Sequence, residues 1–291
     1  MASTITRKID SAGQLRRIDL TLSAGQSFPI PKSDGYPVYS ALLSVIADVD
    51  TDISQRIHNS NLGSLHSSGL IGCFDGSDRP HHKTMRSDTT YDLSLGVVDP
   101  ADEEIFQSLV SALVLEGDTI ELSHGEMRVE SFESSNTSRG ELIEAAGAYE
   151  NPTIEMEFQS PTCIKESEGI TTMFPHRGAV FNSLLGKWNR SAPEDLELDL
   201  TREDIEANVI EKPDDRSYRT HSVLVNRVKN NDGENRNIFR QGFTGKCTYA
   251  FKSANERLEN AVTALALFGE YSGVGSAVAR GCGHVSPEVN D

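Results

Sequence analysis

Hydrophobic and polar positions along the first half of the chain predict alternating strands and helices. Residues 15–24 (LRRIDLTLSA) alternate apolar and polar side chains and predict a strand. Residues 39–58 follow the helical period, and Asp50 is placed to cap a second short helix within this range. Further patterns predict a helix introduced by Pro100 and Asp102, a strand at 68–74, a strand at 88–98 and one or two strands at 119–133. The order βαββαβ is the ferredoxin-like arrangement.

The same order recurs in the second half. Residues 153–158 (TIEMEF) predict a strand, and Pro175 opens a helix with apolar residues at i, i+3, i+4 and i+7. The elements predicted after it are a hairpin of 221–228 and 239–251 around Asn231-Asp232-Gly233, a helix begun by a capping box of Ser253 and Glu256, and a strand near 283–285.

We therefore expect an α+β fold of two tandem ferredoxin-like (RRM-like) βαββαβ domains. A length of 291 residues suits two modest domains. The first is expected at 1–134 and the second at 150–291, with 135–149 as a linker or strand between them. The acidic, proline-bearing stretch 191–217 is expected to be a surface insertion with a short helix at 202–208.

Composition narrows the class of protein. No apolar stretch approaches the roughly 20 residues that cross a bilayer, and residues 1–20 lack the apolar region of a secretory signal. Cys73, Cys163, Cys247 and Cys282 form no CxxC pair, which argues against a zinc ribbon or a disulfide framework. We therefore expect a cytoplasmic protein with no membrane partner.

Charge gives the first specific indication. Asp and Glu number 44 against 27 Lys and Arg, a net charge of −17, and only nine of the basic residues are Lys. This composition indicates a surface adapted to high salt, as in a halophile, with an ordinary acidic protein as the alternative. At molar salt the Debye length is roughly 3 Å, so the net charge does not exclude a nucleic-acid partner. Such a protein would depend on stacking, shape and fixed hydrogen bonds, because salt removes most counterion-release affinity.

Residues 271–284 (YSGVGSAVARGCGH) form a glycine-rich loop after the last predicted helix. Glycine permits positive φ, and successive backbone N–H groups can hold a phosphate. The loop does not begin a βαβ unit, so it is not a dinucleotide-binding fingerprint. The alternative to phosphate binding is a purely structural turn. We expect the loop to lie outside the core, so that the fold survives an added side chain. The residues expected to bind phosphate are Gly273, Gly275, Arg280, Gly281 and Gly283.

In this context the loop resembles the C-terminal signature of the CRISPR repeat-processing endoribonucleases, the "Cas-six" family of repeat-associated RNA-binding proteins. Weaker similarities lie at 36–43, Ile57-His58, 160–162, Phe174-Pro175, Trp188 and 242–249. The resemblance implies a metal-independent cut in the repeat of a CRISPR precursor transcript. A ribose 2′-OH would attack the scissile phosphate and leave a 2′,3′-cyclic phosphate and a 5′-OH. It implies repeat RNA as the partner, and neither a cofactor nor a metal.

The resemblance places the catalytic histidine at His58, where an imidazole suits acid or base work near neutral pH. His66 is the alternative candidate. No histidine pair has the i, i+4 helical spacing of a metal site. A tyrosine of some relatives would fall on Leu43, and a lysine near Ser64. The residues that could substitute for them are Tyr36, Tyr39, Arg56 and Lys83.

The predicted hairpin is one of the most basic stretches of the chain, and we expect it to grip the repeat RNA. A merely solvated hairpin is the alternative. The residues expected to bind there are Arg227, Lys229, Arg240 and Lys246. Two functions from different classes stay open: an endoribonuclease that matures CRISPR RNA, and a non-catalytic RNA-binding subunit of a CRISPR effector complex. The position of His58 favours the first, and the missing tyrosine and lysine favour the second.

Overall fold

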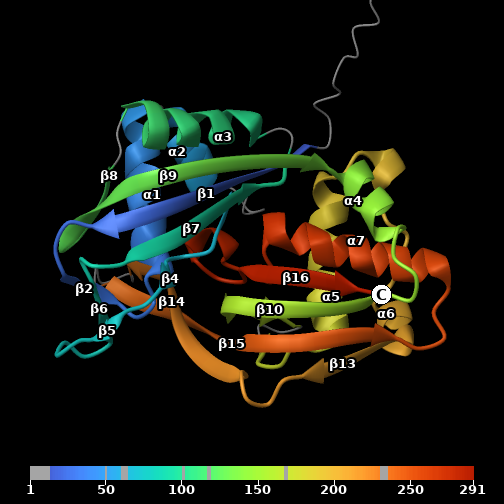
Figure 1. Cartoon of the computed structure of the whole chain (residues 1–291). Coiled ribbons are helices and arrows are strands. Elements are labelled where there is room, and N and C mark those ends of the chain that lie inside the picture. The colour runs from blue at the N-terminus through green and yellow to red at the C-terminus, as the bar shows by residue number, and fades with distance from the viewer. Residues whose placement is uncertain are drawn as a thin grey trace, which may run out of the picture.

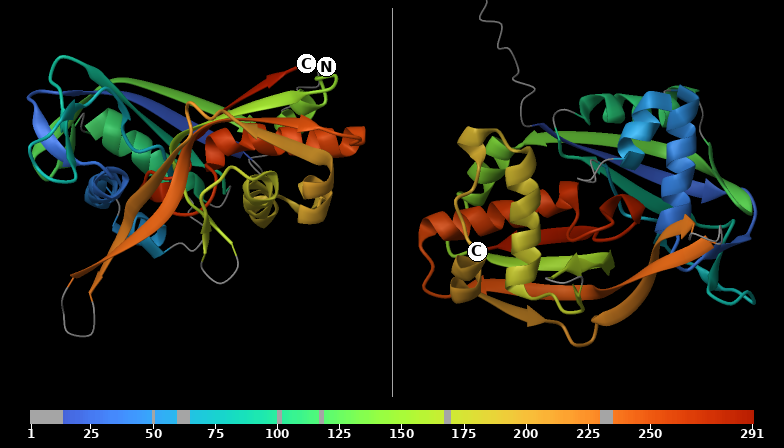
Figure 2. Two further views of the ribbon diagram at one scale, coloured as in Figure 1. Left: turned by 90° about the horizontal axis from the view of Figure 1, so that it is seen from below. Right: turned by 180° about the vertical axis from the view of Figure 1, so that it is seen from behind.

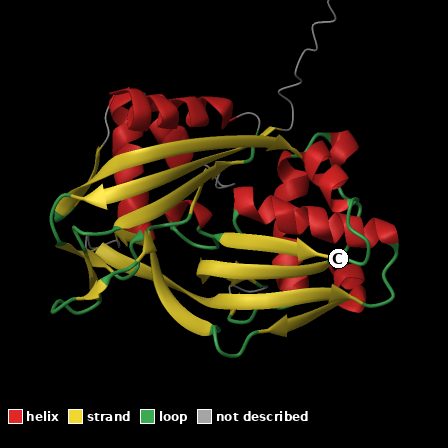
Figure 3. Cartoon of the chain, in the orientation of Figure 1, coloured by secondary structure: helices red, strands yellow, loops and turns green. Residues whose placement is uncertain are grey.

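The computed structural model describes residues 14–49, 51–59, 65–99, 102–116, 119–166, 170–229 and 235–291. Two antiparallel sheets lie one beside the other, with most helices on one side of them (Figures 1 and 2). Helices and strands are interleaved along the chain, so the expected α+β class is confirmed (Figure 3).

The first sheet is built from the N-terminal half. Its strands are β1 (Gln14–Ala24), β3 (Leu65–Ser67), β4 (Ile71–Gly72), β7 (Thr90–Val97), β8 (Thr119–Leu122) and β9 (Gly125–Ser138). The strand order is β3-β7-β1-β9-β8, which places β1 in the centre, as the βαββαβ prediction requires. The helices that cover it are α1 (Gly35–Val49), α2 (Thr51–Asn59) and α3 (Glu103–Val110), followed by a π-helical turn (Ser111–Glu116). A small separate sheet joins β2 (Phe28–Pro31), β5 (Asp75–Gly76) and β6 (His82–Met85).

The second sheet has the same plan. Its strands are β10 (Thr153–Thr162), β13 (Val209–Pro213), β14 (Arg219–Lys229), β15 (Asn235–Phe251) and β16 (Val285–Asn290). The order β13-β15-β10-β16 again puts the first strand of the unit in the centre, and β14 also pairs with the long β15. The remaining elements are α5 (Arg177–Ser191), α6 (Arg202–Asn208), α7 (Glu256–Ser272) and the short pair β11 (Ile164–Lys165) and β12 (Thr171–Thr172).

Several boundaries differ from those that the sequence pattern predicts. Of the strand expected at 68–74, only β4 (71–72) forms; β3 lies before that range, and Gly69 between the two strands has a left-handed φ of +69°. The cap of α7 is Asn255, whose side chain accepts the N–H of Leu258; Ser253 instead lies in the left-handed region. The final strand begins only at Val285. Asp50, Pro100 and the turn at 231–233 lie outside the described residues.

The segments expected to be a linker or strand and a surface insertion carry more regular structure than predicted. The stretch 135–149 holds the end of β9 and a helix, α4 (Arg139–Ala146), with a full capping box from Ser138 and Glu141. The stretch 191–217 contains α6 at the expected position, but it also supplies β13, which pairs with β15 over five residues. The insertion therefore belongs to the second sheet.

Helix α7 joins the two halves. It packs on α4, α5 and β16 of its own half and on β7, β1 and β3 of the other (Figure 1). Nearby, Arg139 is fully buried and lies over the rings of Trp188 and Phe268, at 5.6 and 5.5 Å from their centroids. Its guanidinium donates to the Val98 carbonyl and the Ser191 hydroxyl. Buried contacts of α7 and Arg139 therefore join the two halves, each of which keeps its own hydrophobic core.

Candidate nucleic-acid interface

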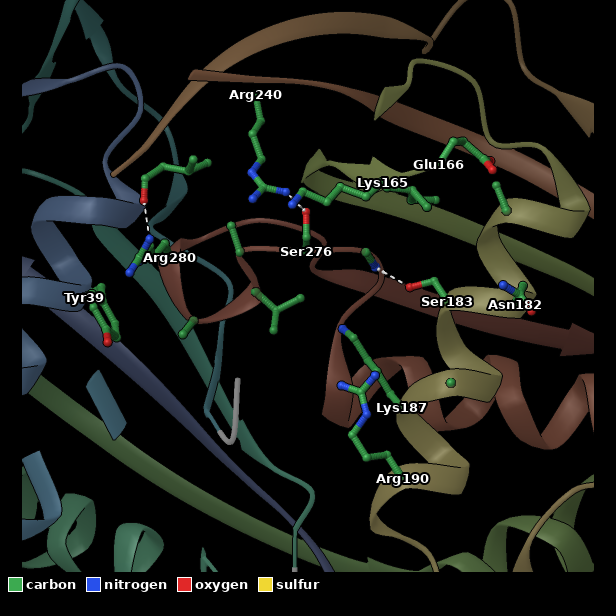
Figure 4. Close-up of a pocket in the computed structure, with 18 of the residues that line it drawn as sticks. Tyr39, Lys165, Glu166, Asn182, Ser183, Lys187, Arg190, Arg240, Ser276 and Arg280 are labelled. Atoms are coloured by element: carbon green, nitrogen blue, oxygen red, sulfur yellow. Dashed lines mark hydrogen bonds between the residues drawn. The ribbon is translucent and has the colours of Figure 1, made fainter. Parts of the chain in front are cut away.

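A cleft of about 750 Å³ opens where the two halves meet (Figure 4). Tyr39 of α1 and Ile57 of α2 line it from the first half. The second half contributes β11, one face of α5, Arg240 of β15 and residues 275–280 of the glycine-rich loop. Part of the loop therefore forms one wall of the cleft.

The walls of the cleft are strongly basic in a chain of net charge −17. Five cationic side chains line it without a carboxylate partner in the described part of the chain: Lys165, Lys187, Arg190, Arg240 and Arg280. A sixth, Arg202, pairs with Glu166 and Glu206 at 2.8 and 2.7 Å. Away from the cleft, seven described cations pair with carboxylates, whereas others such as Arg219 and Arg227 do not; the paired ones are Arg16, Arg17, Lys83, Arg86, Arg177, Lys246 and Arg257. Uncompensated positive charge concentrated in one concavity attracts an anionic ligand.

The glycine-rich loop is held by hydrogen bonds to the second half. The N–H of Gly275 donates to Ser183 Oγ at 2.9 Å, and the N–H of Gly283 donates to the Pro161 carbonyl at 3.1 Å. The N–H of Gly273 closes the last turn of α7 on Gly269. These three glycine amides are thus satisfied within the protein, contrary to the expected phosphate cradle. Beside the loop, the guanidinium of Arg240 donates to Ser276 Oγ at 2.8 Å (Figure 4).

The glycines themselves permit close packing. All four have positive φ: 60° at Gly273, 83° at Gly275, 73° at Gly281 and 74° at Gly283. A Cβ on Gly283 would lie 1.9 Å from the Val274 carbonyl oxygen, and one on Gly281 would lie 2.5 Å from Cα of Gly35. Gly273, Gly281 and Gly283 are buried. The expectation that the loop lies outside the core is therefore wrong, since it is packed between the two halves.

The candidate histidines occupy different environments. His58 lies in α2 directly after Ile57, which lines the cleft, but its side chain is outside the described part of the structure. His66 of β3 is 2% exposed and stacks on His284, with ring centroids 5.3 Å apart. Burial lowers the pKa of His66 well below its usual value and that of His284 to about 4. Both rings are therefore neutral at physiological pH. They are packed inside the protein and are not among the residues that line the cleft.

Of the residues that could replace the missing tyrosine and lysine, the structure places Tyr39 in the cleft. The guanidinium of Arg280 lies over its ring at 5.5 Å, and burial raises the pKa of the phenol, which stays a neutral hydrogen-bond donor. Lys83 pairs with Asp34 at 2.8 Å, and Tyr36 lines a different hollow. The side chain of Arg56, and Ser64, lie outside the described residues.

The basic hairpin does not act as one surface. Arg240 faces the cleft, whereas Arg227 lines a separate hollow with α1 and β8. Lys246 pairs with Glu155 at 2.8 Å on the neighbouring strand. The side chain of Lys229 lies outside the described residues. Arg240 and Lys246 are an even number of positions apart on β15, but between them Gly245 has a φ of +123° and the pairing with β10 shifts register, so the strand is irregular there.

Sequence reasoning missed three of the five unpaired cations, namely Lys165, Lys187 and Arg190. The available signal was on α5, where Asn182, Gly186 and Arg190 follow one another at i, i+4 and i+8 opposite the apolar face. That pattern marks a solvent-facing stripe, but only the tertiary fold turns the stripe toward a cleft.

In the described part of the chain, no three His, Cys, Asp or Glu side chains come together in a way that would hold a metal ion. Within the same ranges, no helix combines the length and apolar character needed to cross a membrane.

Comparison with known proteins gives one consistent family. Residues 156–285 match the family model of the CRISPR-associated endoribonuclease Cas6. A Streptococcus thermophilus protein of that description is 28% identical over 166 residues, which cover 56% of this chain and 62% of the relative, so the chain spans less than two thirds of its length.

Solved structures extend the similarity to nearly the whole chain. Thermus thermophilus Cas6 matches with a TM-score of 0.66 and 20% identity, over 95% of this chain and 99% of its own. A Cas6 product complex matches with a TM-score of 0.69 and 20% identity, over 95% and 100%. These likenesses confirm the fold, two tandem ferredoxin-like units. By sequence and by fold, the chain is similar to Cas6 endoribonucleases.

Proposed function

We propose that this protein is an endoribonuclease that matures CRISPR RNA by cutting within the repeat of the precursor transcript. The cleft between the two halves is the site, and the RNA backbone passes along its cationic walls. The family model and the fold support this assignment. The observation that carries it is the set of five cations without carboxylate partners in the described part of an otherwise acidic chain.

The reaction is an internal transesterification. The 2′-OH upstream of the scissile bond loses its proton to a base, and its oxygen attacks the phosphorus. The bond from phosphorus to the 5′-oxygen breaks, and that oxygen takes a proton from an acid. The products are a 2′,3′-cyclic phosphate and a 5′-OH, and no metal ion is needed. Holding the 2′-OH in line with the leaving oxygen supplies much of the rate.

His58 is the proposed acid or base because it follows Ile57 on the cleft wall and its unperturbed pKa is near neutrality. Tyr39 and Arg280 also line the cleft, and their proposed role is to donate hydrogen bonds to phosphate oxygens. Arg240 and Ser276 bind the backbone further along. We further propose that the protein works in the cytoplasm at high salt, where fixed donors in a preformed cleft retain more affinity than mobile surface charges.

Incubation of the protein with end-labelled repeat RNA in EDTA tests the function. We expect a single cut whose upstream product carries a cyclic phosphate, and no cut in an unrelated RNA of equal length. Loss of cleavage in EDTA, or cleavage of a strand with a 2′-deoxy residue upstream of the cut, would contradict the mechanism.

A non-catalytic RNA-binding subunit of a CRISPR effector complex is the second candidate. By the family resemblance, a tyrosine of some relatives would fall on Leu43 and a lysine near Ser64, and the lack of both in this chain favours this reading. It predicts tight binding of the repeat RNA with no cleavage under any buffer condition, so the same assay separates the two.

A further inference from the structure

Lys187 on α5 connects the cleft to the glycine-rich loop. Its ammonium donates to the carbonyl oxygens of Ser272 and Gly273 at 3.0 and 2.7 Å. These carbonyls end α7, where unpaired C=O groups and the helix dipole favour a cation. One turn earlier on α5, Ser183 accepts the N–H of Gly275. Ser183 and Lys187, at i and i+4 on α5, therefore both form hydrogen bonds to the start of the loop (Figure 4).

The Lys187 ammonium has one N–H donor left for a ligand in the cleft. An ammonium carries three N–H donors, and Lys187 has two hydrogen-bond acceptors among the described residues. Lys187 also lines the cleft, beside Arg190. The charged group that acts on Lys187 is the cationic Arg190 on its own helix, and the charge of Lys187 in turn disfavours protonation of the buried His66.

We propose that Lys187 is a positioning residue for RNA, which holds the glycine-rich loop with two of its protons and binds a phosphate in the cleft with the third. The inference rests on the proposed function for the identity of the ligand. It goes beyond that function because RNA binding then depends on whether the Lys187 amine is protonated. The same ammonium also fixes the position of the loop.

The direction of the pH effect follows from the surroundings of the amine. Burial and the nearby Arg190 lower the pKa of Lys187 to about 7. A phosphate in the cleft supplies the missing negative charge and raises this pKa. Below pH 7 the free protein already carries the proton. Above pH 7, binding must take up a proton, so affinity falls by up to about tenfold per pH unit until the higher pKa of the complex is reached.

The experiment measures the dissociation constant of the full chain for 2′-deoxy-blocked repeat RNA from pH 6.5 to 8.5 at fixed salt. For the wild-type chain, we expect affinity to fall steadily above pH 7. Lys187→Arg keeps the donors and a permanent charge, so its affinity should stay high and flat with pH. Lys187→Met should bind about 10- to 100-fold more weakly at pH 6.5 and lose the pH dependence.

Lys165→Met is the matched control, because Lys165 is a cleft cation on β11 with no bond to the loop. It should weaken binding but keep the wild-type pH dependence. A flat wild-type profile, or a Lys187→Met variant that keeps the wild-type slope, overturns the inference. A circular dichroism spectrum accompanies each variant, and Lys187→Arg keeps the test decisive if Lys187→Met does not fold.

The proposed function and this inference can fail separately. A chain that cuts repeat RNA in EDTA but binds it equally at all pH values overturns the inference alone. A chain that cuts no repeat RNA, yet binds an unrelated single-stranded RNA with a slope that Lys187→Arg removes, supports the inference and contradicts the proposed function.

Discussion

Substitution of Gly283 by alanine should destabilise the whole protein. At φ of +74°, a side chain costs about 1–2 kcal/mol relative to glycine. The new Cβ would lie 1.9 Å from the Val274 carbonyl oxygen, and overpacking of this kind costs about 1–3 kcal/mol. The clash also strains the hydrogen bond from the N–H of Val274 to the Gly283 carbonyl. Together these effects lower the free energy of unfolding by about 2–5 kcal/mol, a large part of a typical stability of about 5–15 kcal/mol.

Urea unfolding of the RNA-free chain, followed by circular dichroism, measures this effect. At an m-value of about 3 kcal/mol/M, the midpoint should fall by roughly 1 M. Gly140→Ala is the matched control: this glycine is in α4, its Cβ would meet only Ser138 Oγ at 3.9 Å, and the change should stabilise by up to about 1 kcal/mol. A Gly283→Ala chain within about 0.5 kcal/mol of wild type would refute the packing argument. Weaker RNA binding by loop glycine variants therefore cannot be assigned to a lost phosphate contact unless their stability is measured too.

Further predictions concern chemistry, charge and pH. His58→Ala should slow cleavage by about 10²- to 10⁴-fold and leave the dissociation constant for repeat RNA nearly unchanged, as filter binding would show. Arg190→Ala should weaken RNA binding and lower the slope of log affinity against log salt by about one, whereas Arg257→Ala, which removes an exposed cation paired with Asp199, should change neither. The folded chain keeps His66 and His284 neutral, whereas in the unfolded chain both become protonated below a pKa of about 6.5. Their contribution to the free energy of unfolding is therefore fully present above that pH. It falls toward pH 4 by up to about 1.4 kcal/mol per pH unit for each ring. Urea midpoints at pH 7 and pH 5 test this, and a His284→Phe chain that keeps the full wild-type difference would count against it.

The local patterns of the sequence were sufficient for most of the elements. The alternation in 15–24 and the helical period after Pro175 arise from burial of one face, which any compact fold of this chain must satisfy. The order βαββαβ, repeated twice, then restricts the topology, because connections between neighbouring elements are short and follow a fixed handedness. The four glycines of the loop also marked a segment with unusual backbone, and the structure places positive φ at all of them.

Which side chains line the cleft depended on packing between segments that are far apart in the sequence. The register of β15 turns Arg240 into the cleft and Lys246 toward Glu155, although both lie on one predicted strand. Lys187 gained its role only when α5 was placed against the end of α7, which is 85 residues away along the chain.

The sequence by itself therefore determined the two βαββαβ units, the acidic surface and the unusual loop, because hydrophobic periodicity, charge and glycine content are local properties of the chain. The tertiary structure decided which cations stay unpaired, which histidines are buried and why the glycines are needed, because each of these depends on atoms from distant segments meeting within a few ångströms.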